Sequence, residues 1–403
     1  MNGPAKLRRP TLRVLSLLLV SGLSCCLGVR LASAQETKVA EKQTSQAAKD
    51  QAADQKASAQ NDASHEKKPE RSGALVVAPL PISSPALGSG IVPVFAYIFS
   101  LGGTNDRSPA SVLGAAGLAT DNGSRALAFA GELYFKRNRY RATAAYVRGN
   151  LNYNLYGLGS GDSQPRLPLK QEGQAVFGEL LRRTAWKFFA GPRFVWGSSL
   201  ITIRSDNAGS VSLPSDIGLR TTLTALGFRV NRDTRPNRFY PTGGMLIDFT
   251  SDFFSKGLGS KYSFQSYKFT FNKYFGFGEK QALAYNFFAC GTGGQPPFYG
   301  NCIYGTNNEL RGYVAGRYLD RYMVATQLEY RLSLPMRFGI VAFGGVGEVV
   351  PGGNQDFSRK NFLPSAGAGG RFQLSKKYHV NLRVDYAQGK DTHTWSVGVG
   401  EAF

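Results

Sequence analysis

Two cysteines carry the clearest covalent chemistry in this sequence. Cys290 falls at the end of an expected strand, and Cys302 falls twelve positions later, at the base of the longest expected loop. A chain exported through an oxidising compartment would join such a pair in a disulfide that pins the loop. The alternative is two free, unreactive thiols. The remaining cysteines, Cys25 and Cys26, lie in an N-terminal segment that we expect to be removed.

Catalytic and metal-binding patterns are weak. The histidines His65, His379 and His393 have no cysteine or second histidine at the spacing of a metal site. No Gly-x-Ser-x-Gly nucleophile elbow occurs. The Gly-rich stretch 157–161 has no strand-to-helix context, so it reads as a loop and not as a phosphate-binding motif. The sequence therefore predicts a protein that is not an enzyme and has no metal and no cofactor.

The composition indicates that strands and turns, and not helices, position the cysteines and histidines. The 403 residues include 48 Gly, 27 Phe and 19 Tyr, which suits strands and tight turns better than helices. Charged residues make up 19%, which argues against a wholly disordered chain. The single long apolar stretch lies at the N-terminus, which excludes a helical membrane transporter.

The first 72 residues divide into two segments. Residues 1–34 have a basic start, an apolar run over 14–27 and the sequence Ala32-Ser33-Ala34, the pattern of a secretory signal peptide. A retained anchor helix is the alternative, but the apolar run is short for one. Residues 35–72 contain no aromatic residue and have nothing to bury, which predicts a disordered periplasmic linker.

Most of the positive charge belongs to the rest of the chain. Of the net charge of +21, five units lie in residues 1–35 and none in 36–72, so residues 73–403 carry +16. This charge favours lipopolysaccharide phosphates, anionic solutes or acidic polypeptides as partners. The simpler alternative is solubility and general attraction to an anionic surface. Because the basic residues are dispersed and the chain is exported, we expect no nucleic acid.

Residues 73–403 alternate with a period of two. Between Tyr322 and Leu334 the apolar residues share one face, while Gln327, Glu329 and Arg331 share the other. Soluble sandwiches also show such strands. Small and ionisable residues on the second face, as in a wet lumen, and turns that alternate between short and long favour a membrane barrel. We therefore predict an all-β, 16-stranded antiparallel transmembrane β-barrel over 73–403. Its expected strands are 74–82, 90–101, 110–120, 124–135, 139–156, 171–182, 186–203, 219–231, 244–255, 261–275, 280–291, 322–334, 337–348, 363–374, 378–388 and 393–403.

Several short motifs, taken in their order, resemble one family. They are Glu309-Leu310-Arg311-Gly312-Tyr313 in the longest loop, Glu329-Tyr330-Arg331 on the next strand, Arg232-Asp233-Thr234-Arg235 after the eighth strand, Leu382-Arg383-Val384-Asp385 on the next-to-last strand, and the final Gly400-Glu401-Ala402-Phe403. Together they resemble the bacterial surface antigen superfamily, the BamA/TamA-like outer-membrane barrels that assemble or translocate other proteins. The resemblance covers residues 74–403.

The resemblance implies a loop that folds back into the barrel lumen. Its motif comprises Leu310, Arg311, Gly312 and Tyr313. Glu329 is the barrel residue that would hold the guanidinium, whose planar fork suits a carboxylate. The alternative is an Arg-Gly-Tyr in a solvated loop. The family usually has an aspartate on the following strand, where this chain has Gly345, so the resemblance leaves one of two expected contacts unassigned.

Two further motifs carry implied roles. The first resembles the family's periplasmic turn through Asp233, Arg235, Asn237, Pro241 and Gly243. The second resembles the terminal strand that insertase machinery recognises, and it comprises Trp395, Val397, Val399 and Phe403. The alternative for this last strand is a lipid-facing role alone, and both can hold together.

The first and last expected strands would meet at a seam. Pro79 and Pro81 remove backbone donors on one side, and Gly398 and Gly400 weaken the other. These residues suggest a weak seam or a lateral gate, as the resemblance implies. The alternative is that both prolines lie in a lead-in segment outside the ladder.

The expected function follows from the resemblance and from one departure. The linker is too short for even one of the periplasmic POTRA domains of the insertases. We therefore expect an outer-membrane barrel that is a diverged or accessory member, acting in outer-membrane protein assembly or polypeptide translocation, with its linker in the periplasm. The alternative is a passive solute channel or a structural surface antigen. The expected partners are outer-membrane lipids including lipopolysaccharide, the insertase machinery during the barrel's own assembly, and a polypeptide client.

Overall fold

The structure is a computed structural model that describes residues 73–84, 87–101, 108–155, 167–204, 218, 220–278, 280–305, 309–350, 361–375 and 379–403. The predicted signal peptide (1–34) and periplasmic linker (35–72) lie outside the described residues. Within the described ranges, no helix is long and apolar enough to cross a membrane.

Sixteen strands form the main sheet. Strands β1 to β11 are Gly73–Ser84, Gly88–Phe99, Ser111–Thr120, Arg125–Phe135, Tyr140–Leu155, Leu167–Arg183, Phe189–Ile203, Arg220–Asp233, Met245–Phe254, Phe264–Phe277 and Gln281–Gly294. Strands β14 to β18 are Tyr322–Ser333, Phe338–Val350, Leu363–Ser375, Val380–Gly389 and His393–Val399. The short strands β12 (Cys302–Ile303) and β13 (Leu319–Asp320) pair with each other in the loop between β11 and β14. Single 3-10 turns cover Ala185–Lys187, Lys256–Leu258 and Phe298–Gly300.

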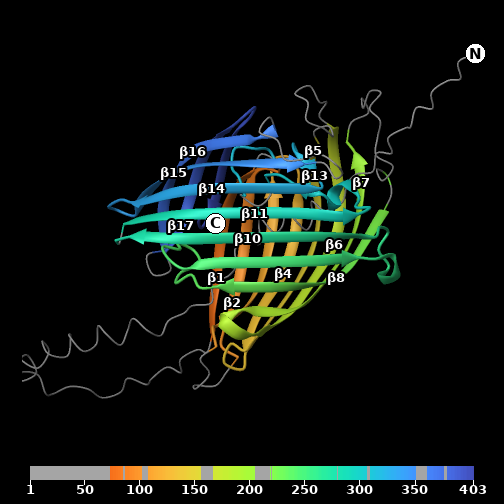
Figure 1. Ribbon diagram of the computed structural model, residues 1–403, viewed down its shortest axis with the longest axis horizontal. Helices are drawn as coiled ribbons and strands as arrows, with labels where there is room; N and C mark the ends of the chain where they lie inside the picture. The colour runs from red at the N-terminus through yellow and green to blue at the C-terminus, as the bar shows by residue number, and fades with distance from the viewer. Residues whose placement is uncertain are drawn as a thin grey trace, which may run out of the picture.

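The sheet closes on itself. Each barrel strand pairs antiparallel with the next, β11 pairs directly with β14, and β1 returns to pair with β18 (Figure 1). This closed, 16-stranded antiparallel barrel confirms the predicted fold class. Closure brings the two edge strands of the sheet together, which suits a lipid-embedded sheet, because lipid tails cannot satisfy backbone donors and acceptors.

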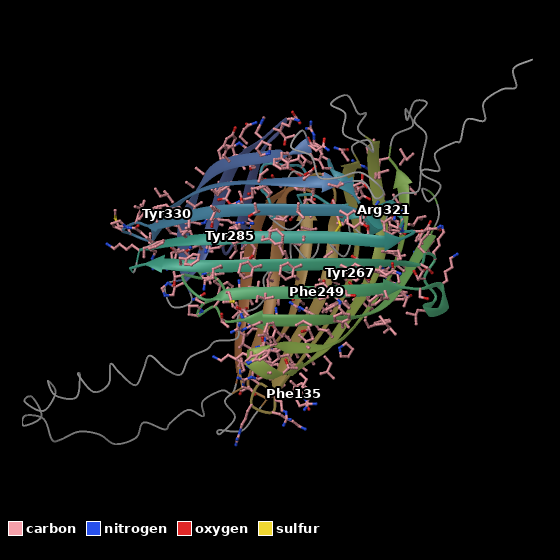
Figure 2. The ribbon with its side chains drawn as sticks, viewed as in Figure 1. Phe135, Phe249, Tyr267, Tyr285, Arg321 and Tyr330 are labelled. Carbon is pink, nitrogen blue, oxygen red and sulfur yellow. A yellow bond between two sulfur atoms is a disulfide. The ribbon has the colours of Figure 1, made fainter. Side chains whose placement is uncertain are left out.

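Side chains alternate between the outer surface and the lumen. In β14, Leu328 is 49% exposed and Tyr330 is 40% exposed, whereas the residues between and beside them are buried. Figure 2 shows Tyr267, Tyr285 and Tyr330 on the outer face of their strands. An apolar outside is what lipid contact demands.

The lumen is not polar throughout. The barrel has a long-loop end, where the connections after β5, β7 and β11 lie, and a short-turn end opposite. A buried apolar cluster spans β2 to β10 and includes Leu151, Ile201, Leu223, Phe264 and the loop residue Tyr299. These strand positions adjoin the long connections, so the cluster lies at the long-loop end, on the β2 to β10 side. The inward-facing residues there are apolar, whereas the sequence predicts small and ionisable ones.

The last strand is shorter than predicted. The sequence predicts a strand over 393–403, but β18 ends at Val399. Gly400 has φ +86°, a left-handed conformation that glycine adopts without strain, and it turns the chain out of the sheet. Arg331 then donates to the Phe403 carbonyl at 2.9 Å from inside the barrel. The outward alternation of Trp395, Val397 and Val399 therefore does not continue to Phe403.

Candidate functional site

The loop between β11 and β14 is fastened at its base by a covalent bond. Cys290 of β11 and Cys302 of β12 form a disulfide, with their Cα atoms 5.8 Å apart. Cys302 also pairs with Asp320 in the β12–β13 ladder. The first and last parts of the loop are thus held together at the long-loop end, and the residues between them project from this base.

Removal of the disulfide gives a first testable prediction. Cys302→Ser should make the loop between β11 and β14 more sensitive to limited proteolysis while the barrel stays folded. The closed stretch is twelve residues long, for which the loss of loop-closure entropy predicts a cost of about 3 kcal/mol. Cys290→Ser and the double variant should match the single variant. Equal cleavage rates in the parent and all three variants would contradict a restraining role.

Arg311 of this loop lies inside the barrel against two strands. Its Nη2 donates to Glu329 Oε2 of β14 at 2.5 Å, and its Nη1 donates to Asp385 Oδ2 of β17 at 2.8 Å. Its Nε donates to Gln327 Oε1 at 3.0 Å. The guanidinium carbon stands 3.4 Å from the centroid of the Phe343 ring of β15, a cation–π contact. Arg311 is 6% exposed, so this charge is held almost entirely by the protein.

The carboxylates that hold Arg311 are shared with two more arginines. Glu329 also accepts from Arg331 Nε at 2.7 Å, and Asp385 accepts from Arg371 Nη1 at 2.5 Å. Arg371 Nε in turn donates to Glu401 at 2.7 Å. We call Arg311, Glu329, Arg331, Arg371, Asp385 and Glu401 the arginine cluster. The side chains of its members are buried, and buried charges persist only where each has paired partners.

Gly312 and Tyr313 fix the loop backbone beside the cluster. Gly312 has φ +100°, and a Cβ there would stand 2.9 Å from Ser365 Oγ, so only glycine fits. Its carbonyl accepts from Thr392 Oγ1 at 2.5 Å. Tyr313 Oη donates to the Pro364 carbonyl at 2.6 Å and accepts from Lys390 N at 3.0 Å. The predicted motif Leu310 to Tyr313 therefore lies in the lumen, against β16 and the turn after β17.

Three tyrosines pack around the motif. The Tyr304 and Tyr313 rings meet edge to face at 5.3 Å, and Tyr313 and Tyr318 do so at 5.7 Å. Burial, followed by the hydrogen bond to Asp391, raises the pKa of Tyr318 to about 12. Tyr318 therefore stays protonated and donates to that carboxylate throughout the physiological range.

Asp385 is the functional residue that sequence reasoning missed. The usual family aspartate position is Gly345, and a Cβ there would stand 2.2 Å from the Thr326 carbonyl and 2.6 Å from Leu310 Cδ1. The loop thus packs where a side chain would be, and β17 supplies the second carboxylate. Two sequence signals pointed to Asp385: it lies on the polar face of its strand, and it ends the stretch Leu382-Arg383-Val384-Asp385, which resembles the family's next-to-last strand.

The predicted turn motif forms a structure that crosses the short-turn end. We call residues 234–244, between β8 and β9, the strap. Asp233 accepts from Arg235 through Nε and Nη2, both at 2.9 Å. Asn237 Oδ1 accepts from the backbone N of Phe239 and Tyr240 at 2.7 and 3.0 Å. These local bonds replace sheet pairing in the strap.

Side chains two residues apart in the strap reach opposite walls. Arg238 Nη1 donates to Tyr134 Oη of β4 at 3.4 Å, and the Tyr240 and Ser333 hydroxyls, the latter in β14, are 3.0 Å apart. Strands β4 and β14 lie on opposite sides of the ring. The Pro241 carbonyl also accepts from Arg331 at 3.3 Å, which joins the strap to the arginine cluster.

Of the two adjacent glycines at the end of the strap, only Gly244 is sterically required to be glycine. Gly243 has open space around the position of a Cβ. Its neighbour Gly244 has φ +77°, and a Cβ there would stand 2.3 Å from the Thr234 carbonyl. The steric requirement for glycine thus belongs to Gly244.

The seam between β1 and β18 is short. Its described register is the single pair Ser83↔Val397, whereas β1 pairs with β2 along its whole length. Pro79 and Pro81 stand opposite Pro93 and Ile91 in that ladder. The alternative that these prolines lie in a lead-in segment is therefore wrong.

A second network of charged side chains lies inside the barrel on strands β6 to β9, away from the arginine cluster. Arg229 of β8 donates to Glu179 at 2.8 Å and to both oxygens of Asp248 at 2.7 Å. Arg193 and Asp252 lie 2.8 Å apart beside it. Each arginine pairs with at least one carboxylate, which is typical of a structural network. Among the residues that the structure describes, no group of three or more His, Cys, Asp or Glu is placed to hold a metal ion.

Comparison with known proteins agrees with this architecture. The Omp85 superfamily domain matches residues 186–403, more than half of the chain. BamA from Haemophilus ducreyi lacking POTRA domains 1–3 is similar in structure at a TM-score of 0.56 and 15% identity, over 81% of this chain and 70% of that chain. CdiB from Acinetobacter baumannii is similar at a TM-score of 0.52 and 13% identity, over 82% of this chain and 60% of that chain. CdiB from Escherichia coli gives 0.53 and 11%, over 82% and 63%.

The similarity to the solved structures is limited in sequence identity and, for the CdiB proteins, in the length covered. The chain spans less than two thirds of the length of either CdiB protein. At such identities the solved structures show the fold alone, and no curated protein matches significantly. The match over 186–403 takes in the strap, the loop motif and the arginine cluster, and from it we conclude that the chain belongs to the Omp85 superfamily.

Proposed function

We propose that this barrel is a diverged or accessory member of its superfamily that acts in outer-membrane protein assembly or polypeptide translocation. The observation that carries the proposal is the arginine cluster, which joins the inserted loop to the chain beyond β18. Arg311 belongs to the loop, while Glu401 follows the seam strand, and Arg371 lies between them. Movement of β18 away from β1 would therefore alter the contacts that hold the loop.

The barrel fold and the family imply a location in the bacterial outer membrane. In our proposal, residues 35–72 lie in the periplasm and the barrel contacts outer-membrane lipids including lipopolysaccharide. Trp395 is 59% exposed on the outer face of β18, which suits both lipid contact and recognition by insertase machinery during the barrel's own assembly. A polypeptide client would be the substrate of the mature protein.

The alternative function, a passive solute channel, requires a water path along the lumen. The apolar cluster at the long-loop end, the inserted loop and the strap all stand in that path. Burial of apolar side chains excludes the water that would carry solutes. These three obstructions favour the assembly or translocation function over steady conduction.

Locking the seam tests the proposal. Ser83→Cys with Val397→Cys places two thiols at directly opposed positions of β1 and β18. Oxidation should abolish complementation in a strain that depends on this protein, and a reductant should restore it. Ser83→Cys with Ser89→Cys, opposed across β1 and β2, is the matched control and should stay active when oxidised. Full activity of the locked seam would reject a function that requires the seam to open.

A further inference from the structure

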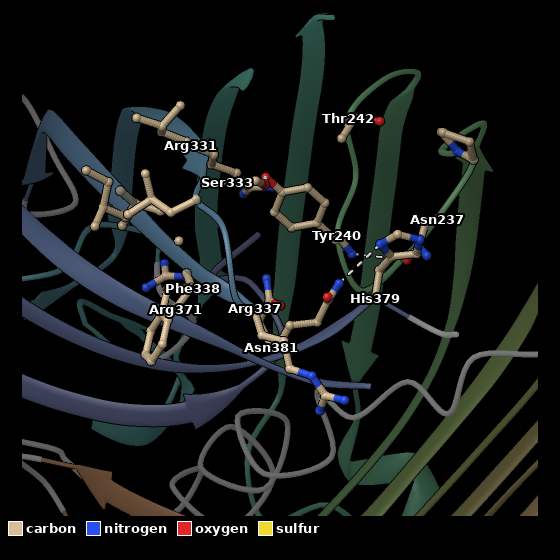
Figure 3. A pocket seen from close by; sticks show the side chains of 17 residues that line it. Asn237, Tyr240, Thr242, Arg331, Ser333, Arg337, Phe338, Arg371, His379 and Asn381 are labelled. Carbon is tan, nitrogen blue, oxygen red and sulfur yellow. Dashed lines mark hydrogen bonds between the residues drawn. The ribbon is translucent and has the colours of Figure 1, made fainter. Parts of the chain in front are cut away.

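A cavity of about 560 Å³ opens at the short-turn end of the barrel. It lies between the strap, the turn from β14 to β15, and the described residues Gln373 at the end of β16 and His379 just before β17 (Figure 3). Asn237 and Tyr240 line it from the strap, and Arg337 lines it from the turn between β14 and β15. Cavities of roughly 300–1,000 Å³ are the usual size of small-molecule sites.

The lining of this cavity carries one sign of charge. Its basic members are Arg331, Arg337, Arg371 and His379. None of the 17 lining residues has a carboxylate. Neutral amides at Asn237, Gln373 and Asn381 add further hydrogen-bonding groups. Arg331 and Arg371 are paired with carboxylates of the arginine cluster, so Arg337 supplies the attraction for anions and the other groups supply hydrogen-bond donors.

One buried donor beside the cavity has no hydrogen bond. Arg371 Nη1 and Nε bind Asp385 and Glu401, but its Nη2 stands 3.8 Å from Glu329, beyond hydrogen-bond distance. No described residue accepts from this Nη2, although the Arg371 side chain is 3% exposed. A buried donor without a partner is destabilising, and an acceptor oxygen of a ligand would satisfy it.

Two basic side chains at the entrance, Arg337 and His379, have fewer partners than the arginines of the arginine cluster. Among the described residues Arg337 forms no ion pair, and it stands at the turn with φ +72°. His379 contacts Gln373 at 3.4 Å, the dashed line in Figure 3. Both side chains can therefore turn toward a bound anion without breaking a carboxylate pair.

We propose that this cavity binds a small anion through its phosphate or carboxylate oxygens, with Arg337 and His379 at the entrance and Arg371 at the inner wall. The site is distinct from the inserted loop, and its occupancy does not depend on the assembly or translocation function. Phosphate and carboxylate share the acceptor geometry that arginine recognises.

Isothermal titration calorimetry on the refolded barrel in detergent micelles tests the proposal. The probes are inorganic phosphate, succinate and uncharged glycerol. We expect saturable binding of phosphate, succinate or both, and none of glycerol. Arg337→Gln should weaken binding about fivefold, the upper range for a partly exposed charge contact. His379→Asn should weaken it similarly, and asparagine tolerates the left-handed backbone at this position.

Lys187→Gln is the matched control. Lys187 lies in the turn from β6 to β7 at the same end of the barrel, has φ +65° and is not part of the lining. Its substitution removes one positive charge but should leave binding unchanged. Binding of only one of the two anions would support the proposed site and identify its ligand class. Absence of saturable binding, or equal weakening by Lys187→Gln, would overturn the proposal.

Discussion

Arg311→Ala should open the barrel to ions and expose the loop between β11 and β14 to protease. The substitution removes the two ion pairs and the cation–π contact that hold the loop against β14, β15 and β17. Breaking a buried pair costs about 3–5 kcal/mol. Glu329 and Asp385 retain Arg331 and Arg371, so the loss should fall on the loop and not on the strands.

Single-channel recording in a planar bilayer measures this effect. The parent should be mostly closed, and Arg311→Ala should show larger and longer openings. Arg317→Ala is the control, because Arg317 lies on the same loop but outside the arginine cluster. Glu329→Ala should resemble Arg311→Ala. A steady open pore in the parent that neither substitution alters would contradict the role of the inserted loop and favour the passive channel.

Asp385→Asn should destabilise the inserted loop about as strongly as loss of Glu329. The amide keeps the shape of the side chain but removes the charge that Arg311 and Arg371 share. We expect a cost of about 3 kcal/mol, near the lower limit for a broken buried pair, because Glu329 still compensates part of the charge. Urea unfolding of the barrel in lipid vesicles, with protease cleavage of the loop, measures it.

A second substitution tests why Asp385 has this role. Gly345→Asp restores the acid at the position where the family usually has one, but its Cβ would press on Thr326 and Leu310. The double variant Asp385→Asn with Gly345→Asp should therefore remain as unstable as Asp385→Asn or become worse. Asp391→Asn, at an exposed turn beside Tyr318, should cost under about 1 kcal/mol. Rescue by Gly345→Asp would refute our assignment of Asp385.

The strands could be predicted from the sequence because lipid contact imposes a strict period of two. That alternation places Gln327, Glu329 and Arg331 on one face of β14, and the structure has all three inside the barrel. The partnership of Arg311 with Asp385 could not be found in this way. The two residues are 74 positions apart, and their contact depends on the position of the loop inside the barrel, which no local sequence pattern encodes.

Two other differences have local causes. Gly400 reverses the backbone at the end of β18, and one such φ value moves Phe403 from the expected outer face to a contact with Arg331. The apolar cluster in the lumen was missed because inward positions near the long connections alternate like any other strand residues. Only closure of the sheet brings Leu151, Ile201 and Phe264 together.

The strap also has a consequence for the order of folding. Its contacts join Arg238 to a residue 104 positions earlier and Tyr240 to one 93 positions later. Contacts of such sequence separation form late, since the entropy of closing the intervening chain must be overcome first. The two hydrogen bonds can exist together only when both flanks of the barrel stand in place. A fluorescent reporter at position 240 would therefore mark the completion of folding and not its beginning.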